Sequence, residues 1–133
     1  TNFFCLTYAL VRKIGGIIPL YQSLLRTTDK GRSLSDSDWK TIRLLFNERL
    51  PQFHKFMADN RNALTDYEYK ICLLVRLYFK PKNIANALNL DASYVTRVRR
   101  SMVKKLFGID ASSKEADMLI RQIDRIKGEE TAD

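Results

Sequence analysis

The chain has 133 residues, 45% of them hydrophobic, which suffices for one domain with a substantial core. Its 5 glycines and 3 prolines are too few for a collagen-like or low-complexity chain, and two distant cysteines with one histidine exclude a disulfide framework and a zinc knuckle. The net charge of +8 is the one large deviation, and it favours an anionic partner such as nucleic acid over a membrane surface.

Residues 1–11 form an uncharged run that ends at Arg12 and Lys13. The run is shorter than the roughly 18 apolar residues that span a bilayer, and it lacks the charged start and cleavage site of a signal peptide. We therefore expect a buried first element, with a remnant of a signal or membrane helix as the alternative. Because the chain starts at Thr1 rather than Met, we expect a fragment or processed product. Free cysteines favour a cytoplasmic location, as such or as the cytoplasmic part of a membrane-linked protein.

The next segments predict helices separated by polar loops. Segment 17–27 carries a proline that a first helical turn tolerates, followed by leucines at helical spacing. A polar loop over 28–35 follows, and the capping-box spacing of Ser35 and Asp38 starts a second helix. Only residues 2–11 have the composition of a strand, so the predicted fold class is all-α. The apolar residues expected in the core are Trp39, Ile42, Leu45 and Phe46 before the helix-breaking Pro51, and Phe53, Phe56 and Met57 after it.

Residues 65–108 carry the most informative pattern and the highest local charge. Thr65 and Glu68 form a second capping box, which opens a helix that Pro81 stops. Cys72 lies among apolar neighbours in this helix, so we expect a small core residue rather than a nucleophile. The proline also sets the first turn of a short helix. Residues 65–108 as a whole have a larger net positive charge than the segments before and after them.

The short helix ends at Leu88, and a third helix over about 92–107 follows directly. Asn89 tolerates the left-handed backbone that a tight corner needs, Asp91 is a suitable N-cap, and Gly108 a suitable stop. Two helices that cross in this way touch at one point, where only a small residue fits. The pattern predicts a helix-turn-helix rather than a plain three-helix core. Its wedge residues are Ile84, Ala85, Leu88, Asn89, Leu90, Val95 and Val98.

The stretch KNIANALNLDASYVTRVRRSMVKKLFG resembles the DNA-binding end of LuxR-type response regulators and of sigma-factor region four. A preamble of the form W…F…P-x-F…LT-x-x-E-x-x-x-C-x-L precedes it. Together they resemble a bacterial group of regulators in which this motif ends a longer sensor or repeat-containing protein. The resemblance covers about residues 34–127 and departs at Asn89, where Gly is commoner, and at Tyr94, where Thr or Ser is usual. It implies double-stranded DNA as the partner and a missing upstream sensory region. The matching preamble residues are Trp39, Phe46, Pro51, Gln52, Phe53, Leu64, Thr65, Glu68, Ile71, Cys72, Leu73 and Leu74.

Outward residues of the third helix are the candidates for DNA contact, because the N-terminal part of a recognition helix meets base edges in the major groove. Arginine pairs well with guanine, and short hydroxyl side chains suit base or phosphate. The buried stripe is expected to comprise Val95, Val98, Met102 and Leu106. The base-edge candidates are Ser93, Tyr94, Thr96, Arg97 and Arg100. The phosphate candidates are Lys82, Arg99, Lys104 and Lys105.

Each of these roles has a structural alternative. Basic residues on a helix commonly form a solvated face with no ligand. Tyr94 either contacts DNA or packs on the first of the three helices predicted in residues 65–108, which opens at Thr65. The aromatic residues of the preamble belong to the core, since a base-stacking platform needs a sheet that the pattern does not predict.

A last helix opens at the capping box of Ser112 and Glu115 and is expected to run to about Lys127. Regulators of this kind bind as two-fold dimers on half-sites, so the apolar stripe of this helix is a candidate homodimer surface. The alternative is that the stripe folds back on the preamble between Trp39 and Phe56. The stripe comprises Ala116, Leu119, Ile120, Ile123 and Ile126.

The sequence contains no pattern that predicts catalysis, a metal site or a cofactor. It has no glycine-rich phosphate loop and no metal-ligand spacing, and its one histidine, His54, has no nucleophile or acid at a suitable distance in sequence. We predict a bacterial transcription regulator with a helical preamble for packing or dimerisation (1–64), a DNA-binding domain (65–127) and a polar tail (128–133). The alternative is a non-enzymatic helical module that docks on RNA polymerase or a partner regulator.

Overall fold

The computed structural model describes residues 18–124. Within this range the chain forms seven α-helices, one 3-10 helix and no strand, which confirms the all-α prediction for that part of the chain. The expectations for residues 1–17 and for the polar tail lie outside the described residues. The elements are α2 (Ile18–Asp29), α3 (Asp36–Arg49), α4 (Pro51–Asp59), the 3-10 helix η1 (Arg61–Ala63), α5 (Asp66–Arg76), α6 (Pro81–Leu88), α7 (Ala92–Phe107) and α8 (Ser113–Arg121).

Local capping sets three of the helix starts, as the sequence predicts. At α3, Ser35 Oγ accepts a hydrogen bond from the Asp38 N–H at 3.1 Å, and Asp38 Oδ2 accepts one from the Ser35 N–H at 3.0 Å. The capping boxes predicted for α5 and α8 form in the same reciprocal way. Each box satisfies two of the N–H groups that a helix start leaves without an intrahelical partner.

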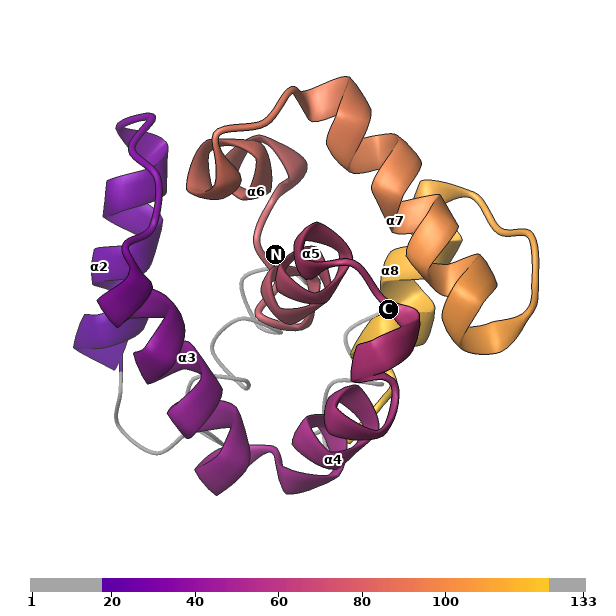
Figure 1. The fold of residues 1–133 in the computed structure, drawn as a ribbon. Coiled ribbons are helices and arrows are strands. Elements are labelled where there is room, and N and C mark those ends of the chain that lie inside the picture. The colour runs from indigo at the N-terminus through magenta and orange to yellow at the C-terminus, as the bar shows by residue number, and fades with distance from the viewer. Residues whose placement is uncertain (1–17, 125–133) are drawn as a thin grey trace.

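Helix α5 lies at the centre of the molecule, with the other helices arranged around it (Figure 1). Every residue from Ile71 to Phe79 is buried, so this segment is covered on all sides rather than on one face. Cys72 Sγ lies 3.5 Å from Met57 Sδ of α4, and burial raises the pKa of its thiol. Cys72 is therefore a core residue, as predicted.

Helix α5 ends at Arg76, before the stop that the sequence predicts at Pro81. Tyr78 then adopts a φ of 63°, in the left-handed region that bulky residues rarely occupy. The guanidinium of Arg121, on α8, lies 4.4 Å from the centre of its ring. The early end of α5 is thus supported by a contact between distant parts of the chain, which a local pattern does not reveal.

The preamble and the remainder of the chain share one hydrophobic core. A single cluster of buried residues extends from Tyr21 on α2 to Ile120 on α8. The ring of Phe56, on α4, stacks on that of Phe107, on α7, at 5.8 Å. The predicted boundary between residues 64 and 65 therefore lies inside one packed body.

Helix α2 packs on α6 through a buried polar contact as well as through apolar side chains. Asn83 Nδ2 donates hydrogen bonds to Thr28 Oγ1 at 2.9 Å and to Asp29 Oδ1 at 2.7 Å. Asn86 Nδ2 donates to the Thr28 carbonyl at 2.8 Å. These bonds tie the C-terminal end of α2 to the helix that precedes α7.

Helix α8 ends at Arg121 rather than near Lys127. The following turn brings Asp124 back to the preamble, where its Oδ2 accepts hydrogen bonds from the N–H groups of Gln52 at 3.1 Å and Phe53 at 3.4 Å. Helix α4 has no side-chain cap of its own, so a carboxylate from the far end of the chain supplies it.

The apolar stripe of α8 belongs to the core of this chain. Ala116 and Ile120 are completely buried, and α8 packs mainly on α5 and α7. Leu119 and Ile123 are half-buried against the same cluster. Ile126 lies outside the described residues.

Candidate nucleic-acid interface

A tight corner joins α6 to α7. Asn89 has φ 55° and ψ 49°, so it adopts the left-handed conformation that the sequence predicts. Its N–H donates to the Asn86 carbonyl at 3.2 Å, and the Leu90 N–H donates to the Ala85 carbonyl at 2.8 Å. This pair of bonds is the Schellman arrangement, which closes α6 within a short turn and lets α7 begin at once.

The predicted wedge residues lie on both sides of this corner. Ala85 is 5% exposed, so there is little free space next to its methyl group. Asn89 is exposed at the tip of the corner, and the remaining six residues are buried or half-buried. The buried members are Ile84, Ala85, Val95 and Val98, and the half-buried ones are Leu88 and Leu90.

Helix α7 presents one apolar and one basic face. It contains no acidic residue, so nothing within the helix neutralises its cations. Val103 is part of the buried face, which the sequence does not predict. Leu106, which the sequence predicts to be buried, is half-buried. The opposite face carries an exposed stripe, called here the α7 stripe, which comprises Ser93, Arg97, Arg100, Ser101 and Lys104.

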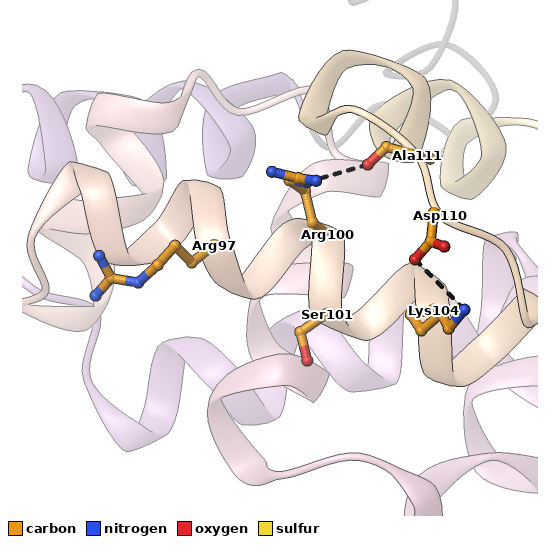
Figure 2. Close-up of a pocket in the computed structure, with 6 residues that line it drawn as sticks. All are labelled: Arg97, Arg100, Ser101, Lys104, Asp110 and Ala111. Atoms are coloured by element: carbon orange, nitrogen blue, oxygen red, sulfur yellow. Dashed lines mark hydrogen bonds and ion pairs between the residues drawn. The ribbon is translucent and has the colours of Figure 1, made fainter.

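The two arginines predicted to contact bases are both exposed, and they differ in their surroundings. Arg100 Nε donates to the Ala111 carbonyl at 3.2 Å, whereas the Arg97 guanidinium extends away from it toward the start of α7 (Figure 2). Among the described residues neither arginine forms an ion pair. Both charges are therefore available to an external anion.

Tyr94 packs toward α5, which was the structural alternative for this residue. Its half-buried ring meets the ring of Tyr67 edge to face, with 6.5 Å between centroids and 84° between planes. The Arg97 guanidinium lies 5.6 Å from the centre of the Tyr94 ring. Tyr94 thus lies between a neighbouring helix and an exposed arginine.

A shallow groove runs along the α7 stripe beside the loop that leads to α8. It has a volume of about 300 Å³, and Arg97, Arg100 and Ser101 line it together with Lys104, Asp110 and Ala111 (Figure 2). Lys104 Nζ lies 3.4 Å from Asp110 Oδ1, and both side chains are largely exposed. Such an exposed pair is weak, so an anionic ligand competes readily for the lysine.

Arg99 is not part of this surface. It is 6% exposed, and its guanidinium makes a two-pronged ion pair with Asp117 of α8, with 2.8 Å between Nε and Oδ1. The Arg99 side chain points toward α8, and separating it from the buried Asp117 carboxylate would cost free energy. We therefore do not propose Arg99 as a phosphate contact, although the sequence predicts that role.

Lys105 is engaged with a buried carboxylate. Its Nζ donates to Glu68 Oε1 at 2.8 Å, and Ser101 Oγ donates to Glu68 Oε2 at 3.2 Å. Burial by itself raises the pKa of the Glu68 carboxyl. The hydrogen bonds from Lys105, Thr65 and Ser101, with the lysine charge, outweigh that effect and lower the pKa below its ordinary value. Lys105 thus holds α7 on α5.

The remaining candidates lie at or near the surface, and the contacts that Ser93 and Thr96 make are to residues close in sequence. Lys82 is exposed at the start of α6, and Ser93 is exposed with its Oγ 3.5 Å from Asp91 Oδ2. Thr96 is half-buried, and its Oγ1 donates to the Ala92 carbonyl at 3.2 Å. Asp91 occupies the predicted N-cap position but makes no capping bond with its side chain.

Sequence reasoning missed the partners of these residues. The sequence indicates Glu68 as a cap and as part of the family resemblance but not as the partner of Lys105, and it gives no role to Asp110, Asp117 or Tyr67. Helical spacing places a charge on a face of its own helix but does not say which other helix covers that face. In the sequence, the position of Asp117 between Ala116 and Ile120 of the apolar stripe was a signal that this acid could face a neighbouring helix.

The described residues show an exposed basic helix face and few other chemical features. Within residues 18–124 no three His, Cys, Asp or Glu side chains converge on a metal-sized site, and no helix is long and apolar enough to cross a membrane. Guanidinium and ammonium groups along one helix can bind phosphates and the acceptor atoms of bases. Comparison of the chain with known protein families, with characterised proteins and with solved structures finds no match.

Proposed function

We propose that this chain binds double-stranded DNA in a sequence-specific manner, as the DNA-binding part of a bacterial transcription regulator. The observation that carries the proposal is the α7 stripe. It lies on the second of two helices, α6 and α7, joined by a turn of a few residues, the arrangement of a helix-turn-helix. The resemblance to LuxR-type regulators and sigma-factor region four supports the same function.

The roles follow from exposure and position. The major groove is about 12 Å wide and admits one α-helix. With α7 in the groove, Arg97 and Arg100 near its N-terminal half reach base edges. Lys104 farther along α7 and Lys82 at the start of α6 reach phosphates, which fix the register.

The first step of the test is a selection of bound sequences from random duplexes, followed by binding measurements on the selected and on a random duplex. Arg97→Ala and Arg100→Ala each weaken binding to the selected duplex by about 1–3 kcal/mol and relax the preference at one position. Lys104→Ala weakens binding to both duplexes alike. Lys55→Ala is the matched control, because this exposed lysine lies on α4 and pairs with Asp59.

The second step is a salt titration. Binding through phosphates weakens with a log–log slope of about −0.9 for each phosphate neutralised, and Lys104→Ala makes the slope shallower by about one phosphate. Equal losses on selected and random duplexes in the arginine variants contradict base contact. Absence of DNA binding, with salt-insensitive binding to RNA polymerase or a partner regulator, supports the docking module instead.

A further inference from the structure

Three side chains form a continuous series at the N-terminal end of the α7 stripe. Tyr67 lies in the first turn of α5 and is 44% exposed, and its ring is set edge to face with that of Tyr94 on α7. One helical turn farther along α7, the Arg97 guanidinium lies 5.6 Å from the Tyr94 ring centre. Residues at this spacing on a helix are neighbours, so the contact follows from the backbone.

The ring of Tyr94 restricts the arginine. An exposed arginine has many rotamers and loses much of that freedom when it binds a base in one orientation. An aromatic face attracts a guanidinium electrostatically, which favours rotamers that keep the cation over the ring. The Tyr67 ring fixes the Tyr94 ring in turn, because edge-to-face pairs have a preferred geometry.

We infer that Tyr94, held by Tyr67, is a positioning residue that orients Arg97 for base contact and does not itself contact DNA. The expected effect on DNA binding rests on the proposed function. The order of the Arg97 side chain is a property of the chain alone. Two readouts therefore separate the inference from the proposed function.

The first readout needs no DNA. The order parameter of the Arg97 Nε–H bond, measured by NMR relaxation, is expected to fall in Tyr94→Leu and to stay at the wild-type value in Tyr94→Phe. Leucine keeps apolar bulk against α5 but has no aromatic face, whereas phenylalanine keeps the face and lacks the hydroxyl. The Arg100 Nε–H bond is the internal control, because Arg100 bonds to the Ala111 carbonyl instead.

The second readout is a double-mutant cycle on the selected duplex. Tyr94→Leu is expected to weaken binding roughly 3- to 10-fold, while Tyr94→Phe stays within about twofold of the wild type. In the Arg97→Ala background Tyr94→Leu is expected to cause no further loss. Tyr67→Leu is expected to give a smaller loss that also disappears in that background. Melting temperatures identify any variant that fails to fold. If Tyr94→Leu fails, Tyr67→Leu decides, through the Arg97 order parameter and the same cycle with Arg97→Ala.

Three results overturn the inference. If Tyr94→Phe weakens binding as much as Tyr94→Leu, the phenolic hydroxyl contacts DNA directly. If the losses of Tyr94→Leu and Arg97→Ala add, the two residues act independently. If Arg97 keeps its order parameter in Tyr94→Leu, the ring does not restrict it, whether or not the chain binds DNA. A chain that binds no duplex but loses order at Arg97 in Tyr94→Leu contradicts the proposed function and retains the positioning role.

Discussion

Two residues at the corner between α6 and α7 illustrate how single side chains set the geometry of the candidate interface. Asn89 adopts the left-handed backbone that closes α6, and Ala85 occupies a site with 5% exposure. A larger residue at Ala85 has to push α6 away from its neighbours. Both residues lie outside the α7 stripe, yet they determine the direction in which α7 leaves the corner.

Ala85→Leu is expected to lower the free energy of unfolding by about 1–3 kcal/mol, because extra methylene groups overpack a well-filled site. Urea unfolding followed by circular dichroism measures the change. Ala58→Leu is the matched control, since Ala58 is exposed on α4, and we expect a change within about 0.5 kcal/mol there. An Ala85→Leu variant as stable as the wild type contradicts the tight crossing.

At the scale of elements, α7 is held by ionic contacts to two of the helices on which it packs, α5 and α8. Arg99 pairs with Asp117 of α8, and Lys105 bonds to Glu68 of α5. Arg97, Arg100 and Lys104 form neither of these contacts and are exposed. Two of its basic residues thus hold α7 in place, and the others form the surface that it presents.

The contact between α5 and α7 makes stability depend on pH. The pKa of Glu68 lies below its ordinary value in the folded chain, so folding favours the charged carboxylate. Its contribution is fully present above the ordinary carboxyl pKa and is lost as the pH falls through the lowered one. Lys105→Met removes the charge that lowers the pKa, so stability is expected to fall at a higher pH than in the wild type. Urea unfolding between about pH 3 and 7 measures this, with Lys55→Met as control.

At the scale of the whole molecule, two arginines connect the C-terminal end of α5 with α8 and the turn that follows it. Arg76 of α5 donates to the Ile123 carbonyl at 3.1 Å and to the Asp124 carbonyl at 2.9 Å. In return, Arg121 Nε of α8 donates to the Val75 carbonyl at 3.0 Å. A carbonyl oxygen has two lone pairs and can accept such a bond in addition to a backbone one, so the two arginines link the ends of both helices. The central helix is thereby tied to the last described turn.

Asp124 extends this connection to α4, and its removal is expected to destabilise the whole molecule. Asp124→Gly deletes the carboxylate but still allows the φ of 55° at this position, and the expected loss is about 0.5–2 kcal/mol, as for other helix caps. Asp124→Asn keeps an acceptor oxygen and tolerates the same backbone, so it is expected to lose less. Equal stability of Asp124→Gly and the wild type in urea unfolding contradicts the cap.

Local patterns in the sequence determined the helix starts and the corner. A capping box spans only a few residues, so Ser35 and Asp38 specify their own geometry, and the same holds for Asn89, whose short polar side chain tolerates a left-handed backbone. The candidate base contacts Arg97 and Arg100 were also predictable, because helical spacing placed them opposite the apolar stripe. Both are exposed as that spacing requires.

Only the tertiary structure decided which cations remain exposed. Arg99 and Arg100 are adjacent in the sequence and identical in type, yet one is buried against Asp117 and the other faces the groove. Helical spacing already places Arg99 on the apolar side of α7, four residues after Val95 and three before Met102. Only the tertiary structure supplies the acid, 18 positions away on another helix, that pairs with its charge there, and the acid 37 positions away that binds Lys105. A charge is buried only when its partner is brought to it, and the packing of α5, α7 and α8 around one core brings those partners together.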